Sequence, residues 1–129
     1  MRDILFRGKR QDNHKWVRGY FRLVCGCSLI VEENTTDCLG VAVIPDTVGQ
    51  FTGLFDENNK KVFESDIVII EFAETTIKGV VCYKEASFYI STNDELWEID
   101  NYCYIKVLGN IYDNPKLLKK LNEESEDTD

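Results

Sequence analysis

The chain has 129 residues, of which 43% are hydrophobic and 29% are charged, and its net charge is −8. This length and composition indicate one folded domain and exclude a disordered chain. No apolar run reaches about 18 residues, and the residues after Met1 lack the apolar stretch of a signal peptide, so we expect neither membrane insertion nor export. Five cysteines without a tight framework argue against a secreted disulfide scaffold. We therefore expect a cytoplasmic protein with reduced thiols.

The charge is unevenly distributed along the chain. Residues 1–24 hold seven Lys or Arg against two Asp, residues 25–120 hold eight basic against sixteen acidic side chains, and residues 121–129 hold five acidic and no basic ones. The sequence therefore has a basic head, an acidic body and an acidic tail, and the acidic body would repel phosphate.

Alternation of apolar and polar side chains predicts two hairpins in the first part of the chain. An opening strand at residues 4–7 connects through a polar turn to a second strand at residues 16–24. β-Branched runs at residues 29–32 and 39–44 predict the second hairpin. It ends at Pro45, because proline lacks the N–H group that strand pairing requires.

The next part of the chain is also expected to form strands. Gly49 and Gly53 predict a bent or bulged strand, and the turn that follows contains Asn59, which tolerates a positive φ. Residues 67–72 are apolar on both faces and predict the most buried strand. The expected strands are residues 47–54, 67–72, 77–83, 88–91 and 102–112, with a turn at residues 56–61.

One short C-terminal helix is expected after the last strand. Asn114 is a good N-cap and Pro115 a good first helical residue, and leucines 117, 118 and 121 form an apolar stripe. Many short strands with one terminal helix predict a mostly β fold, a small antiparallel barrel or sandwich. We expect a single domain over residues 1–121 and an acidic, disordered tail over residues 122–129, because the tail offers nothing apolar to dock.

Four groups of residues resemble a known family. They are Phe6-Arg7 with Lys15-Trp16 and Gly19; residues 45–54 with Asp56; Val62-Phe63-Glu64 with Asp66-Ile67-Val68; and residues 108–112 with Asn114-Pro115 and Leu117-Leu118. In these groups the chain resembles the YopX-like proteins, which are encoded mainly by bacteriophages and prophages of Gram-positive bacteria. The groups span nearly the whole chain and leave out only residues 25–39 and the acidic tail.

The resemblance implies a mostly β fold and a phage or prophage protein in the cytoplasm of a bacterial host, and it transfers no catalytic residue. The stretch from Glu64 to Val68, followed by Gly79-Val80-Val81, also resembles small SH3-like barrels, so we expect such a barrel in the C-terminal half. Ser65 and Asn59 depart from the family pattern, which usually has glycine at both positions. A positive φ at Ser65 would cost about 1 kcal/mol or more.

The strand expected at residues 16–24 has the most suggestive surface. Since side chains alternate, Val17, Phe21 and Leu23 share an apolar face, and the opposite face is aromatic and basic. The candidate binding residues are the aromatic-basic face and one basic neighbour: Arg7, Trp16, Arg18, Tyr20 and Arg22. Rings that stack on bases and arginines that neutralise phosphate favour nucleic-acid binding. We prefer a different interpretation: the face is an ordinary solvated one with arginine stems over the rings, or it is a protein interface. The reason is that the acidic body of the chain would repel phosphate.

Other residues with reactive side chains give weaker signals. Cys25, Cys27 and Cys38 offer three thiolates to zinc, but a closed site needs four ligands, and we expect buried free thiols instead. His14 has no nucleophile or carboxylate beside it in the sequence, so we expect a surface turn residue and not a general base. Glu64 and Asp66 are spaced for a carboxylate pair, yet turn or strand-edge positions at the mouth of a barrel are preferred.

We therefore expect a non-enzymatic phage accessory protein that acts through protein contacts and needs no cofactor or metal. Aromatic side chains suit interfaces and favour a homo-oligomer. Those expected to be exposed are Trp16, Tyr20, Tyr104 and Tyr112. The partner is then a second copy or another host or phage protein, not a membrane. The alternative is a small-barrel nucleic-acid-binding protein that uses the basic-aromatic strand, and a hydrolytic or metal-dependent enzyme ranks last.

Overall fold

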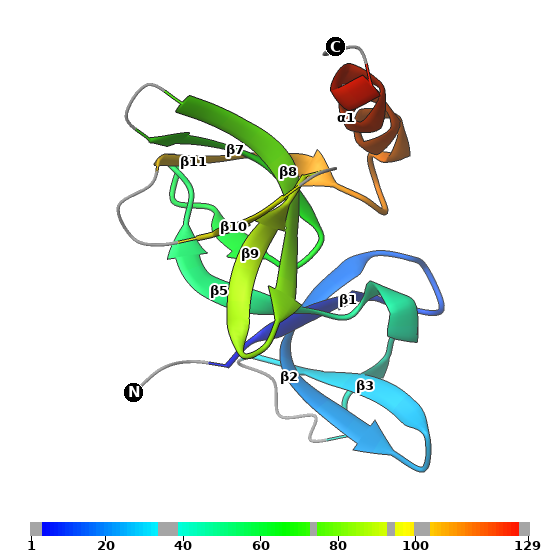
Figure 1. Cartoon of the computed structure of the whole chain (residues 1–129). Helices are drawn as coiled ribbons and strands as arrows, with labels where there is room; N and C mark the ends of the chain where they lie inside the picture. Colours follow the sequence, from blue (N-terminus) through cyan, green and yellow to red (C-terminus); the bar gives the residue numbers. More distant parts are fainter. Residues whose placement is uncertain (1–3, 34–38, 73–74, 93–94, 100–103, 127–129) are drawn as a thin grey trace. The chain divides into compact units, whose positions relative to one another are not determined.

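A computed structural model describes residues 4–33, 39–72, 75–92, 95–99 and 104–126 of the chain (Figure 1). Contacts within the chain divide it into two compact units, Met1–Phe51 and Thr52–Asp129. The fold is mostly β, with antiparallel sheets and one short C-terminal helix. The predicted fold class is confirmed at this level.

Unit 1 is a meander of antiparallel strands. Its elements are β1 (Phe6–Lys9), β2 (Trp16–Val24), β3 (Cys27–Glu32), β4 (Val41–Ala42), the 3-10 helix η1 (Pro45–Thr47) and the first residues of β5 (Gly49–Phe55). The strands lie in the order β4-β3-β2-β1-β5. Both predicted hairpins are confirmed, since β1 pairs with β2 and β3 pairs with β4.

A small core holds unit 1 together. Val17, Ile30 and Val43 are buried, and Phe6 and Val48 pack against them. Gly19 is needed beside this core, because a Cβ added there would overlap the backbone carbonyl of β3 opposite it. Close approach of two backbones therefore selects glycine at this position.

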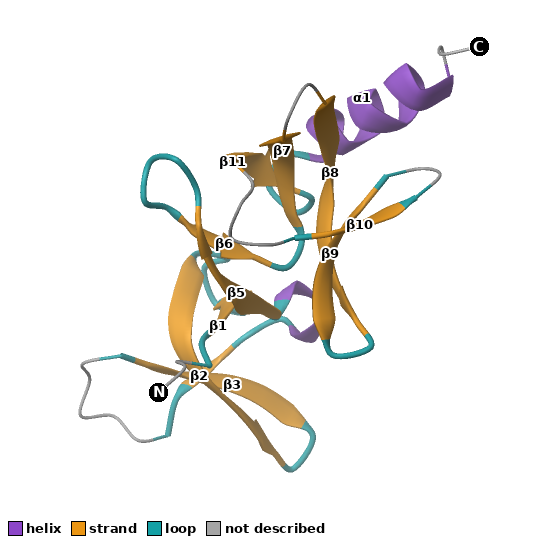
Figure 2. Ribbon diagram, turned by 60° about the vertical axis from the view of Figure 1, so that its left-hand side comes forward, coloured by secondary structure: helices purple, strands orange, loops and turns teal. Residues whose placement is uncertain are grey.

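Unit 2 contains a five-stranded antiparallel sheet in the order β10-β9-β8-β7-β11 (Figure 2). Its elements are β6 (Lys61–Phe63), β7 (Asp66–Phe72), β8 (Thr75–Lys84), β9 (Ser87–Ser91), β10 (Leu96–Glu98), β11 (Tyr104–Asn110) and α1 (Pro115–Glu126). Strand β6 lies beside β5, where the Thr52 hydroxyl donates a hydrogen bond of 2.9 Å to the Val62 carbonyl.

The core of unit 2 is larger and centres on β7. Ile67, Val68 and Ile70 of this strand are fully buried, which confirms the prediction that the 67–72 strand is the most buried. The core cluster consists of Val62, Val68, Ile70, Ile77, Val81, Ile90 and Ile105. β7 is so well covered because β8 pairs with one of its edges and β11 with the other.

Three features of unit 2 differ from the sequence-based expectations. The described strands form open sheets and no closed barrel, since β10 and β11 stand at opposite ends of the strand order. Strands β6 and β10 were not expected, because three residues are too few to show alternation. Helix α1 begins at Pro115 as predicted but continues to Glu126, and so includes the first residues of the expected tail.

The turn between β5 and β6 is organised by the buried carboxylate of Asp56. Its Oδ1 accepts hydrogen bonds from the backbone N–H groups of Asn58 (2.9 Å) and Lys60 (2.8 Å), and its Oδ2 lies 3.4 Å from the Val107 nitrogen. Burial raises the pKa of the Asp56 carboxyl, but hydrogen bonds from these three N–H groups lower the pKa by more, so the net shift is downward. Asn59 has a φ of 62°, as predicted.

The turn between β6 and β7 places Ser65 in the left-handed region, with a φ of 73°. The Ser65 N–H donates to the Val81 carbonyl (2.7 Å), and the Ser65 carbonyl accepts from the Ile111 N–H (3.0 Å). The buried Asp66 carboxylate accepts a hydrogen bond of 2.8 Å from the Phe63 N–H across the same turn. Ser65 therefore adopts the conformation that costs a residue other than glycine about 1 kcal/mol or more, and these hydrogen bonds hold it in place.

Candidate interaction surface

Strands β1 and β2 bring Arg7 and Trp16 together. In their antiparallel register Lys9 lies opposite Trp16 and Arg7 lies opposite Arg18. The Arg7 guanidinium carbon stands 4.6 Å from the centre of the Trp16 ring, and the Lys9 ammonium nitrogen stands 5.4 Å from it. Arg7 is only 6% exposed. The Trp16 ring is therefore engaged by cations of the protein itself, as in the preferred interpretation of arginine stems over rings.

The other three candidate residues are exposed on one face of β2. Arg18, Tyr20 and Arg22 alternate along the strand and all face solvent. Tyr20 pairs with Val31 of β3, and Arg22 pairs with Leu29. This face therefore combines two guanidinium groups and a phenol ring with partly buried aliphatic side chains.

The opposite face of β2 does not stay buried along its length. Val17 lies in the core, but Phe21 is 36% exposed and Leu23 is 66% exposed, so the apolar face predicted from alternation is covered at Val17 and open beyond Gly19. The reason is that β1 pairs with β2 only as far as Gly19. Phe21 keeps a ring contact with Phe6, at 5.6 Å between centroids.

Strands β2 and β3 also form a hairpin, and we call its outer part, residues 20–31, the arm. Four exposed large apolar side chains follow one another closely in it: Tyr20, Phe21, Leu23 and Val24. Sequence reasoning missed Leu23 and Val24 as surface residues, because alternation shows which side chains share a face but not what covers that face. The mismatch between a four-residue β1 and a nine-residue β2 is the signal that could have shown it.

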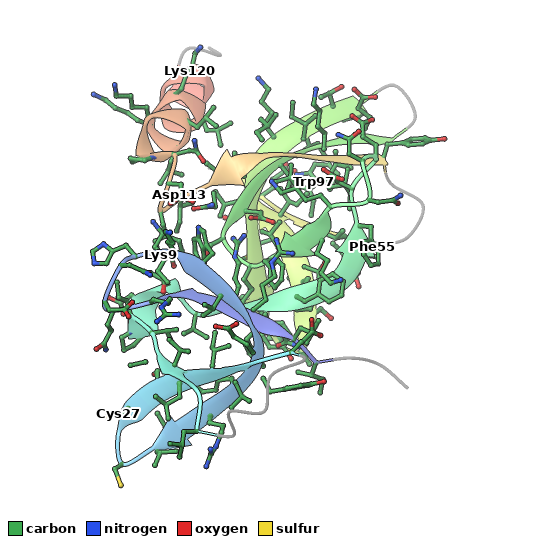
Figure 3. All side chains as sticks on the ribbon, turned by 180° about the vertical axis from the view of Figure 1, so that it is seen from behind. Lys9, Cys27, Phe55, Trp97, Asp113 and Lys120 are labelled. Carbon is green, nitrogen blue, oxygen red and sulfur yellow. The ribbon has the colours of Figure 1, made fainter. Side chains whose placement is uncertain are left out.

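The arm ends in a tight two-residue turn. Val24 pairs with Cys27, and the residues between them, Cys25 and Gly26, have φ values of 51° and 80°. Positive φ at both central residues is the type I′ pattern, whose twist matches that of a hairpin. Cys25 and Cys27 are exposed free thiols, and Figure 3 shows the Cys27 sulfur directed outward at the end of the hairpin. The expectation of buried thiols is therefore wrong for these two, and Cys38 lies outside the described residues.

The remaining candidate residues fall in turns. His14 is an exposed turn residue with a φ of 60°, as predicted. Glu64 and Asp66 flank Ser65, and the Asp66 carboxylate accepts a hydrogen bond from the Phe63 N–H across the turn. Within the described part of the chain, no group of three or more His, Cys, Asp or Glu side chains is arranged to hold a metal ion.

Most of the chain matches one protein family. The model of the YopX protein family matches residues 4–119. The chain belongs to the YopX family. The YopX match includes all of β2, and thus the arm, as well as the turn at Ser65. No curated protein matches the chain.

The described residues of this YopX protein include no helix that is both long and apolar enough to span a membrane. Of the aromatic residues expected at an interface, Tyr20 and Tyr104 are exposed, whereas Trp16 and Tyr112 are partly buried. Four of the exposed large apolar side chains of unit 1 lie on the arm, and two more, Ile4 and Leu39, lie outside it.

Proposed function

We propose that this YopX protein is a phage or prophage accessory protein that acts in the cytoplasm of its host through protein contacts, as a homo-oligomer and without catalysis of its own. The observation that carries the proposal is the arm. Four large apolar side chains at 36% to 66% exposure stand on five consecutive residues, and soluble monomers rarely present such a cluster without a binding partner.

The composition of the arm also supports a protein partner. Tyrosine, phenylalanine and arginine are enriched at the centres of protein interfaces, and the arm carries all three within Tyr20–Arg22. A two-stranded hairpin also offers backbone groups along its free edge, which pair with the edge of another sheet.

The proposal is tested by the mass of the purified, reduced protein in solution. Sedimentation equilibrium over a range of micromolar concentrations is expected to give a mass above 14.9 kDa that rises with concentration. Leu23→Asp should lower this mass toward that of one chain, because it places a charge on the most exposed apolar side chain of the arm. A wild-type protein that stays monomeric throughout would refute the homo-oligomer.

A second function, binding of nucleic acid by the β2 strand, is supported by the exposed Arg18, Tyr20 and Arg22 on one face of that strand. Two phosphate contacts predict that affinity falls roughly tenfold between 50 and 200 mM salt. Fluorescence polarisation with single- and double-stranded probes tests this, with Arg18→Ala/Arg22→Ala as the variant. Polarisation that stays flat at low salt would eliminate this function.

A further inference from the structure

One edge of the arm is unpaired within the described residues. β3 pairs with β2 from Gly19 to Val24, but β1 covers the other edge only up to Gly19. In the described part of the chain no further strand pairs with that edge at Phe21 and Leu23. An apolar, unpaired strand edge is a template for another strand, and natural proteins protect such edges unless they are used.

The charge of the arm restricts its partner. The arm contains Arg22 and no acidic side chain, and residues 13–19 just before it add Lys15 and Arg18, again with no acidic side chain. If two arms paired with each other, their arginines would be brought together, and like charges across a strand pair are destabilising. The arm therefore suits an apolar strand edge that is acidic.

Unit 2 carries such an edge at β10. This strand ends the sheet order β10-β9-β8-β7-β11, and among the described strands it pairs with β9 alone. Leu96 is 46% exposed, and Glu95 and Glu98 are exposed on either side of it. Residues 85–105 contain five acidic side chains and no Lys or Arg, the reverse of residues 13–31.

We propose that the arm of one copy binds the β10 edge of a second copy, a deepening that rests on the proposed homo-oligomer. Leu23 packs against Leu96, and backbone groups of the two edges pair. Arg22, on the opposite face of β2, lies against Glu95, which directly precedes β10, while Arg18 and Glu98 add to the attraction between the two edges. The contact is heterologous, because it joins two different surfaces of the same chain. The β10 edge is short, so each contact is small and weakens as salt screens the charges.

Charge reversal on each side tests this contact by sedimentation equilibrium. Arg18→Glu/Arg22→Glu and Glu95→Lys/Glu98→Lys are each expected to lower the mass toward a monomer. An equimolar mixture of the two variants, and one chain that carries all four changes, should associate again because opposite charges then face each other. Lys119→Glu/Lys120→Glu on α1 is the matched control for the arm, since these exposed lysines undergo the same change in charge, and Glu57→Lys is the control for β10.

The outcomes separate this inference from the proposed function. A wild-type protein that remains monomeric refutes the homo-oligomer and the contact together. A wild-type oligomer whose mass is unchanged in both charge-reversed variants refutes only the contact, as does a mixture that stays monomeric. Leu23→Ser and Leu96→Ser give the same test with little risk to folding, since both side chains are exposed. Each is expected to lower the mass of the oligomer, and a mass that is unchanged in both variants refutes the contact.

Discussion

Replacing Ser65 by glycine should stabilise the protein. Ser65 holds a φ of 73° in the turn between β6 and β7, a conformation that costs an L-residue about 1–2 kcal/mol. Glycine removes this cost but loses about 0.5–1 kcal/mol more conformational entropy on folding. The expected net gain is about 0.5–1 kcal/mol. We expect the backbone to keep this conformation in the wild-type protein, because hydrogen bonds to Val81 and Ile111 fix Ser65.

Thermal unfolding followed by circular dichroism measures this gain. A stabilisation of about 0.5–1 kcal/mol raises the melting temperature by roughly 2–5 °C in a chain of this length. Ser87→Gly is the matched control: Ser87 begins β9 and is not among the described residues with a positive φ, so glycine there should lower the melting temperature. Ser65→Ala separates the backbone from the hydroxyl group and should leave the strain in place. If Ser65→Gly melts at or below the wild-type temperature, the argument from backbone strain is wrong.

The turn between β8 and β9 offers a second gain: Glu85 and Ala86 have φ values of 51° and 66°, so Glu85→Asn with Ala86→Gly should raise stability by roughly 1–2 kcal/mol in urea unfolding. Gly19→Ala should have the opposite effect and cost about 2 kcal/mol or more, because the new methyl group overlaps the Val31 carbonyl, and an unchanged urea midpoint would contradict this. The pKa of Asp56 is lower in the folded chain, so its contribution to stability is present above about pH 4 and is lost as the pH falls through the folded pKa. Asp56→Asn should therefore flatten the fall in melting temperature below pH 4, and an equally steep fall in the variant would contradict this role.

Elements that depend on local sequence could be predicted well. The bounds of β2 and the start of α1 agree with the sequence-based expectations, because alternation over nine residues and an Asn-Pro pair are strong local signals. The positive φ at Asn59 followed from the turn chemistry of the sequence in the same way. Elements of three residues, such as β6 and β10, leave no period to detect.

The candidate site could be predicted only in part, because burial depends on which strands meet. Arg7 and Arg18 look equivalent in the sequence, yet Arg7 is buried under the Trp16 ring and Arg18 is exposed. Their difference arises from what packs on each side chain: the Arg7 guanidinium lies 4.6 Å from the centre of the Trp16 ring, whereas Arg18 is on the solvent-facing side of β2. Alternation alone contains no information on such neighbours.

The same dependence explains why an apolar arm is kept at the surface of unit 1. Phe21 and Leu23 continue the apolar face that Val17 begins, so a β1 extended toward its N-terminus would cover them and enlarge the core. The described strand β1 instead begins at Phe6, which leaves the edge and the face of the arm exposed together. The strand thus combines an open hydrophobic face with exposed charges that are all basic. Such a surface is unfavourable for an isolated chain, but it is suited to binding an acidic partner. The arm is therefore better explained by association than by the folding of unit 1 alone.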